Sequence, residues 1–216
     1  MHTKPVSDDS SAAGKLPVFT QAPADSKWAI FREQLEQVYR ASTRPRILSI
    51  GNGRAEEAEA LLSSPPEKTR GEFVAFDDNH AALDFLARKF AANEAVKIGG
   101  TVRSLAEQSA DLGAFDFIYS NTLLERLETE QAQNVVAALA LMLKPGGALL
   151  LANSTPRYEY ADKLPIYRSE FDMARLTNKI SEHRTAGHAV FCDGPGSTVF
   201  LEVHSRAAAR SRAARA

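Results

Sequence analysis

The chain has 216 residues and a mass of 23.5 kDa, a size that fits one globular domain. Its 26 Lys and Arg residues are balanced by 27 Asp and Glu residues, so the formal net charge is -1 and no nucleic-acid partner is expected. The single cysteine, Cys192, excludes an intramolecular disulfide and a metal cluster of several thiolates, so we expect a cytoplasmic protein without a metal site.

The two ends of the chain have the composition of solvated tails. Residues 1–26 mix Ser, Ala, Asp, Pro and Lys around one short apolar patch, and residues 206–216 are rich in Arg and Ala without apolar periodicity. We expect a disordered arm over 1–26, one domain over 27–205 and a basic disordered tail over 206–216. No stretch reaches the roughly 18 apolar residues of a membrane span, and none is expected.

Helical and strand-like segments alternate through the domain. Apolar spacing, β-rich runs and Gly or Pro breaks predict these elements. In chain order they are helix 28–39, strand 46–50, helix 54–62, strand 73–76, helix 81–90, strand 96–98, strand 115–119, helix 130–143, strand 148–152, a short helix after Ser169, and a hairpin over 188–203.

This alternation is typical of an α/β fold. It predicts a doubly wound, mainly parallel seven-stranded sheet that ends in an antiparallel C-terminal hairpin. Ligands of such sheets bind beyond the carboxyl ends of the strands. The candidate site therefore lies among residues 49–54, 77–80, 101–104 and 119–122, together with the segment after Ala152.

A glycine-rich turn follows the first strand of the domain, with the sequence Ser49-Ile-Gly51-Asn-Gly53-Arg-Ala55-Glu56. Gly51 permits a tight turn, and Gly53 lets a ligand approach the backbone. Glu56 stands where the dinucleotide fingerprint has its last glycine, and its charge would repel a pyrophosphate at a helix N-terminus. Glu56 and Glu57 instead suit the first turn of a helix and a ligand without phosphate.

An acid ends the second strand, 26 residues beyond Gly51. There the Asp77 carboxylate can accept hydrogen bonds from both hydroxyls of a ribose, although a helix cap is the other reading of this residue. Its neighbour Asp78 is expected to cap the helix that follows.

At this point the chain resembles the class I S-adenosylmethionine-dependent methyltransferases, over roughly residues 46–203. The resemblance joins the glycine turn, Asp77, the run Phe115-Asp-Phe-Ile-Tyr-Ser-Asn121 and the segment Leu143-Lys-Pro-Gly-Gly147 before an apolar strand. It implies a Rossmann-like methyltransferase fold and S-adenosylmethionine as the cofactor. The cofactor-binding residues that it implies are Ser49, Gly51, Gly53, Asp77, Thr101, Val102, Ser120 and Asn121. Ser49 departs from the family, which usually has Asp or Glu there.

The resemblance also suggests an acceptor. The segments 115–127, 149–156 and 166–168 are similar to bacterial small-molecule members that include enzymes methylating 3-hydroxy fatty acids to esters. We therefore expect transfer to oxygen, with a carboxylate as candidate, on a small and partly apolar substrate. Candidate substrate-binding residues are Tyr158 and Tyr167, which supply aromatic rings, and Arg168, which can hold a carboxylate.

The catalytic residue and the oligomeric state stay open. His80, Glu125, His183 and His188 are the candidate bases, and none stands out, while a carboxylate substrate needs no base. Two alternatives remain. One is a protein that binds S-adenosylmethionine or a partner without catalysis. The other is a nicotinamide-dependent oxidoreductase, against which Glu56 and the terminal hairpin argue.

Overall fold

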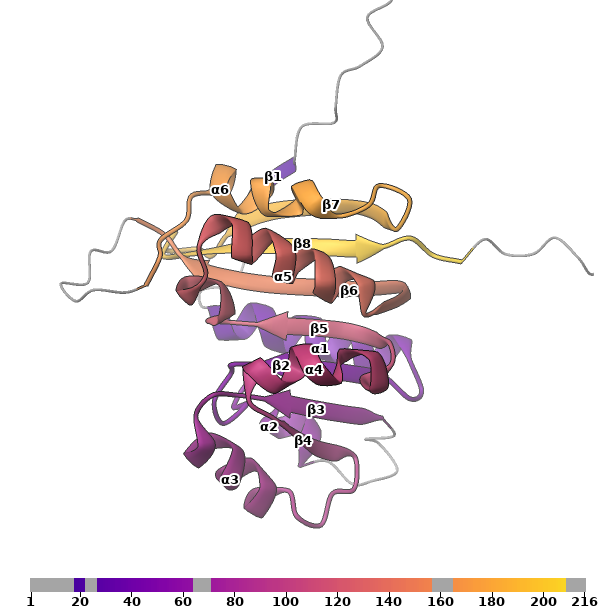
Figure 1. Ribbon diagram of the computed structural model, residues 1–216. Coiled ribbons are helices and arrows are strands. Elements are labelled where there is room, and N and C mark those ends of the chain that lie inside the picture. Colours follow the sequence, from indigo (N-terminus) through magenta and orange to yellow (C-terminus); the bar gives the residue numbers. More distant parts are fainter. Residues whose placement is uncertain (1–17, 22–26, 64–70, 157–164, 209–216) are drawn as a thin grey trace, which may run out of the picture.

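The computed structural model describes residues 18–21, 27–63, 71–156 and 165–208 (Figure 1). These residues form one eight-stranded sheet in the order β1-β7-β8-β6-β5-β2-β3-β4. The strands are β1 (Val18–Gln21), β2 (Arg46–Ile50), β3 (Glu72–Phe76), β4 (Val96–Gly100), β5 (Phe115–Ser120), β6 (Leu143–Ser154), β7 (Thr185–Cys192) and β8 (Thr198–Ser205).

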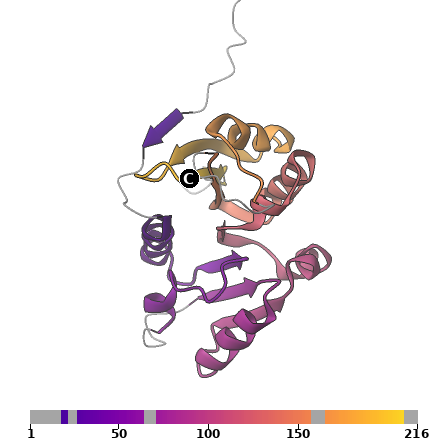
Figure 2. The ribbon, with the colours of Figure 1, turned by 90° about the vertical axis from the view of Figure 1, so that its left-hand side faces the viewer.

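Helices cover both faces of this sheet. They are α1 (Lys27–Ala41), α2 (Glu59–Leu62), α3 (His80–Lys89), α4 (Val102–Leu112), α5 (Thr129–Leu141) and α6 (Glu170–Arg175), with the 3-10 turns η1 (Leu123–Arg126) and η2 (Leu176–Lys179). One apolar core packs α4, α5 and α6 against the sheet, and a second packs α1, α2 and α3. Figure 2 shows α1 on one side of the strands and α4 and α5 on the other.

The predicted fold class is confirmed. Every neighbouring pair of strands in this sheet is parallel except the two that involve β8, which runs antiparallel to β6 and β7. The seven predicted strands are all present, and β1 is an eighth. This strand, Val18–Gln21, pairs with β7 and lies inside residues 1–26, where no strand was predicted.

Two element boundaries also differ from the prediction. α2 begins at Glu59 rather than at residue 54, because Ala55 has a φ of 50° that a right-handed helix cannot contain. α5 ends at Leu141, and the Lys144-Pro-Gly-Gly147 segment belongs to β6, where it makes an irregularity opposite the start of β5. The turn residues thus interrupt a strand pairing instead of following a helix.

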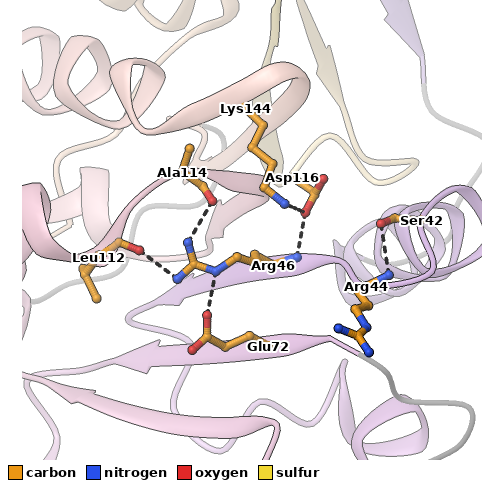
Figure 3. A network of polar contacts seen from close by, with 8 residues as sticks. All are labelled: Ser42, Arg44, Arg46, Glu72, Leu112, Ala114, Asp116 and Lys144. Carbon is orange, nitrogen blue, oxygen red and sulfur yellow. Dashed lines mark hydrogen bonds and ion pairs between the residues drawn. The ribbon is translucent and has the colours of Figure 1, made fainter.

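A charged network ties the strands together where they begin (Figure 3). The Arg46 guanidinium donates to Glu72 with an Nε–Oε2 distance of 2.6 Å and to the backbone carbonyls of Leu112, at the end of α4, and Ala114, just before β5. The Arg46 backbone N–H donates to Asp116 Oδ2 at 2.7 Å. Lys144 Nζ lies 2.6 Å from the same oxygen. Four charged side chains therefore link β2, β3, β5 and β6 at their amino ends.

Candidate functional site

The candidate site lies at the opposite edge, where β2, β3 and β5 end. In Figure 1 the arrowheads of β3 and β5 point to this edge, on the left. The chain leaves β2 on one side for β3 and β4 and returns on the other side for β5, so this edge is the switch point at which doubly wound sheets bind ligands. A cavity there is lined by Gly51, Asp77, Asp78, Val102, Thr122, Leu123, Arg126 and Leu127.

The glycine turn takes left-handed backbone conformations at both glycines. The φ angles are 65° at Gly51 and 60° at Gly53. A Cβ added to Gly51 would lie 3.1 Å from Thr122 Oγ1, whereas a Cβ added to Gly53 would meet no atom within 4 Å. Gly51 is therefore needed for the turn and its packing, and Gly53 leaves open space in which a ligand can reach the backbone.

Asp77 faces this turn from the end of β3. Its side chain accepts hydrogen bonds from the backbone N–H of Gly53 at Oδ2 and of Asn79 at Oδ1, both at 2.8 Å. Only 9% of the residue is exposed. Each carboxylate oxygen has a further lone pair, so these two bonds leave Asp77 able to accept from ligand hydroxyls.

The residue that caps the helix after β3 is neither Asp77 nor Asp78, the two candidates that the sequence suggested. Asn79 caps α3, because its side chain accepts from the backbone N–H groups of residues 81 and 82. Asp78 does not cap that helix. It accepts from the Val102 N–H at 3.0 Å and lies 3.9 Å from Arg126 Nη1. The two acids thus hold separate turns at the rim of the cavity.

The two residues predicted to contact the adenine, Thr101 and Val102, lie at the start of α4. Thr101 is the N-cap of that helix, with Oγ1 accepting from the Ser104 N–H at 3.2 Å, and Val102 lines the cavity. The structure therefore brings Val102 to the same cavity as Gly51 and Asp77, which come from two other strand ends.

Ser120 and Asn121 close the site from the end of β5. The Ser120 hydroxyl donates to the carbonyl of Ile50 at 2.6 Å, and the Asn121 backbone N–H donates to Asn52 Oδ1 at 2.8 Å. Both residues are buried. The turn after β2 and the turn after β5 are thereby joined.

Asn52, which the sequence reading passed over, is the hub of that junction. Its side-chain Nδ2 donates to Ser49 Oγ at 2.9 Å and to the carbonyl of Tyr119 at 3.3 Å, and only 8% of the residue is exposed. The available signal was an amide residue between two glycines at the end of a strand. Ser49, the position where the family has an acid, is 3% exposed and is bonded to this amide.

The two acids after the glycine turn have different surroundings. Glu56 is exposed, whereas Glu57 is 2% exposed and its Oε1 accepts from the Tyr119 hydroxyl at 2.5 Å. Burial raises the pKa of Glu57, and the Tyr119 hydrogen bond opposes that shift. Since α2 begins only at Glu59, the expectation that both acids occupy the first turn of a helix is wrong.

The predicted substrate residues are placed differently from one another. Tyr158 lies outside the described residues, and Tyr167 is partly buried. Arg168 is 2% exposed, and its Nη1 donates to the Leu124 carbonyl at 2.6 Å and to Asn153 Oδ1 at 2.9 Å. Its Nη2 donates to the carbonyl of Leu127. Burial lowers the pKa of Arg168. The guanidinium thus braces η1, which lines the cavity.

The candidate bases are spread over the molecule. His80 and His183 are exposed, and burial lowers the pKa of His188 in β7. Glu125 accepts from the Ser154 hydroxyl at 2.6 Å. In the described part of the chain, none of these four residues lines the cavity at the strand ends.

Comparison with known proteins identifies the kind of domain. Residues 47–147 match the sequence profile of the methyltransferase domain family. No curated protein matches the sequence. In the described residues, no helix is long and apolar enough to cross a membrane.

Solved structures share the fold at low sequence identity. The N-methyltransferase NodS from Bradyrhizobium japonicum WM9, in complex with S-adenosyl-L-homocysteine, has a TM-score of 0.58 and 15% identity, over 84% of this chain and 89% of that one. Magnesium protoporphyrin IX methyltransferase (ChlM) from Synechocystis PCC 6803, with the same ligand bound, has a TM-score of 0.60 and 12% identity, over 83% of each chain.

The CurJ carbon methyltransferase has a TM-score of 0.61 and 15% identity, over 85% of this chain and 56% of that one. The sheet order, the glycine turn at its switch point and the profile match agree with one another. Residues 47–147 thus form a methyltransferase domain, on the fold of the class I S-adenosylmethionine-dependent methyltransferases.

Proposed function

We propose that this methyltransferase transfers the methyl group of S-adenosylmethionine to an oxygen atom of a small, partly apolar molecule, with the carboxylate of a hydroxy acid as the candidate acceptor. The observation that carries the cofactor site is the pairing of Asp77 with the open glycine turn at the switch point of the sheet. The acceptor rests on the character of the cavity and on the groups around it.

The residues at the strand ends suit this cofactor. Open space beside Gly53 admits a ligand against the backbone, and Asp77 offers carboxylate oxygens to a ribose. Val102, which lines the cavity, would supply an apolar contact for an adenine, and the buried turn at Ser120 and Asn121 would meet the methionine part. When bound, the cofactor supplies a methyl group on a sulfonium. The protein then has to align an acceptor with that methyl group and exclude water.

Two observations favour oxygen as the acceptor. The turn after β5 reads Ser120-Asn-Thr-Leu123, in place of an amine-positioning Asn-Pro-Pro-Tyr motif. Among the described residues, no candidate base lines the cavity, and a carboxylate is already ionised near neutral pH and needs none. Leu123 and Leu127 make part of the lining apolar, which suits a substrate with a hydrocarbon portion.

The test is an assay with methyl-labelled S-adenosylmethionine against panels of carboxylic acids, phenols and amines. Methylation of carboxylic acids is expected, with a rate at saturation that stays nearly flat from mildly acidic to mildly basic pH, because neither reactant titrates there. Methylation confined to amines, to carbon or to nucleic acid would overturn the oxygen acceptor. Cofactor binding without any methylated product would favour a non-catalytic binding protein.

A further inference from the structure

Behind the glycine turn, two buried side chains form a polar pair that the cofactor contacts do not use. Glu57 comes from the turn before α2, and Tyr119 comes from β5, 62 residues later in the chain. Tyr119 is 0% exposed and Glu57 is 2% exposed. The phenol donates to Glu57 Oε1 at 2.5 Å, so the pair fixes the start of α2 to the middle of the sheet.

This pair is costly for the folded protein. The second carboxyl oxygen, Glu57 Oε2, is buried and has no hydrogen-bond partner among the described residues. The surroundings are an apolar cluster that includes Phe31, Ala58 and Phe117. An apolar side chain at position 57 would avoid the desolvation of a carboxyl group. The presence of an acid at position 57 is therefore explained by the part of the chain that its hydrogen bond to Tyr119 holds in place.

The backbone just before Glu57 is also in an unfavourable conformation, and this conformation brings Glu57 to its contact with Tyr119. Ala55 has a φ of 50°, a left-handed conformation that is unfavourable for a residue with a Cβ. The Ala55 N–H donates to the Asn52 carbonyl at 3.2 Å, and the Ala55 carbonyl accepts from the Ala58 N–H at 3.0 Å. The chain reverses at Ala55, after which Glu56 is exposed and Glu57 is buried. Strain of this kind persists where the surrounding contacts require it.

Tyr119 connects the pair to the cofactor turn at a second point. Its carbonyl accepts from Asn52 Nδ2 at 3.3 Å, and Ser49 is its partner across the β2–β5 pairing. The phenol holds Glu57, four residues beyond Gly53, while the carbonyl accepts from Asn52 in the middle of the turn. The Gly51–Gly53 turn and the segment that follows it are thereby attached to one residue of β5.

We infer that Glu57, acting through Tyr119, is a positioning residue that holds the Gly51–Gly53 turn in the shape that binds the cofactor. Neither side chain lines the cavity in the described structure, so the effect is on the turn and not on the ligand itself. This inference rests on S-adenosylmethionine as the cofactor of the proposed function.

The test compares cofactor affinity with stability in four variants of this pair and one control variant, all made in the full chain. Affinity is the Kd for S-adenosylhomocysteine, measured by calorimetry, and stability is the unfolding midpoint. Loss of the contact should lower the population of the binding-competent turn to about one tenth, so Tyr119→Phe and Glu57→Leu should each raise that Kd by about tenfold.

The conservative variant and the double variant sharpen the result. In Glu57→Gln the amide oxygen still accepts the Tyr119 hydroxyl, so this variant should keep a Kd close to that of wild type. Tyr119→Phe combined with Glu57→Leu should bind no more weakly than either single variant, since both remove the same contact.

The matched control is Asp193→Asn, which changes another buried acid, 3% exposed, that bonds within the β7–β8 turn. It should lower the unfolding midpoint and leave the Kd unchanged. A wild-type Kd in folded Tyr119→Phe would overturn the positioning role. Affinity losses of the two single variants that add up in the double variant would overturn it as well. If wild-type protein does not bind S-adenosylhomocysteine, the cofactor assignment fails and this inference fails with it.

Discussion

The two edges of the sheet use their charges in opposite ways. At the amino ends, Arg46, Glu72, Asp116 and Lys144 satisfy one another across four strands (Figure 3). At the carboxyl ends, Asp77 accepts from two backbone N–H groups and faces a cavity. Ions that neutralise one another hold strands together, whereas an acid held by backbone donors keeps oxygens for a ligand. Damage at the first edge should therefore appear in stability, and damage at the second in binding.

The largest effect is expected from Gly53→Val at the carboxyl edge. A valine side chain would occupy the open space beside the turn, and a β-branched residue resists a φ of 60°. Calorimetry should show loss of measurable S-adenosylhomocysteine binding in a protein that remains folded. Normal binding by a variant that melts far below wild type would make Gly53 a structural glycine only.

Asp77→Ala should have the next largest effect. Removing a charged hydrogen-bond acceptor costs roughly 1.5–3 kcal/mol, so the Kd for S-adenosylhomocysteine should rise by roughly 10- to 150-fold. The unfolding midpoint should fall less, because Asp77 lies at a strand end and its two bonds tie turns rather than strands. An unchanged Kd in the folded variant would rule out the ribose contact.

Asp116→Ala is the counterpart at the amino edge. It leaves the Arg46 backbone N–H and the Lys144 ammonium without their shared acceptor. The free energy of unfolding, measured by urea denaturation, should fall by about 1–2 kcal/mol, since the site is partly exposed. The Kd for S-adenosylhomocysteine should not change. A rise in Kd as large as the one expected for Asp77→Ala would remove the distinction between the two edges.

The smallest effect is a pH dependence at the amino edge. His204, near the end of β8, lies 3.2 Å from Glu202 Oε1, and this hydrogen bond raises the His204 pKa above its usual value of 6.5. The contact therefore stabilises the fold at pH below that value, and its contribution is lost as pH rises through the higher folded pKa. Urea unfolding from pH 5.5 to 8.5 should show this small loss in wild type and not in His204→Gln. An identical slope in both proteins would contradict it.

Much of the fold is predictable because its signals are local. The periodicity over residues 130–143 fixes a helix, and the Gly/Pro turn between two β-rich runs fixes the hairpin. β1 has no such signal, because four residues become a strand only when β7 lies beside them. α4 was not predicted either, since Leu105 is its single buried residue and polar or small residues fill most of its other positions.

The candidate site was predictable to the extent that strand ends determine it. Gly51, Asp77 and Val102 meet at one cavity as their positions after parallel strands require. The inward turn of Glu57 was not predictable, because it depends on a left-handed Ala55, a conformation that alanine rarely adopts. The contacts of Arg168 were also hidden, since two of the three are made to backbone carbonyls that the sequence does not display.

The short strand β1 changes what the sheet offers to other protein chains. It pairs in parallel with Ala189–Cys192, so this part of β7 has strand neighbours on both sides. Without β1, β7 would present a row of open backbone donors and acceptors, which is a template for strand addition and aggregation. By covering β7, the strand that precedes the methyltransferase domain would then also protect the domain from aggregation. A chain that starts at residue 27 should self-associate with rising concentration in light scattering, while its cofactor site stays intact.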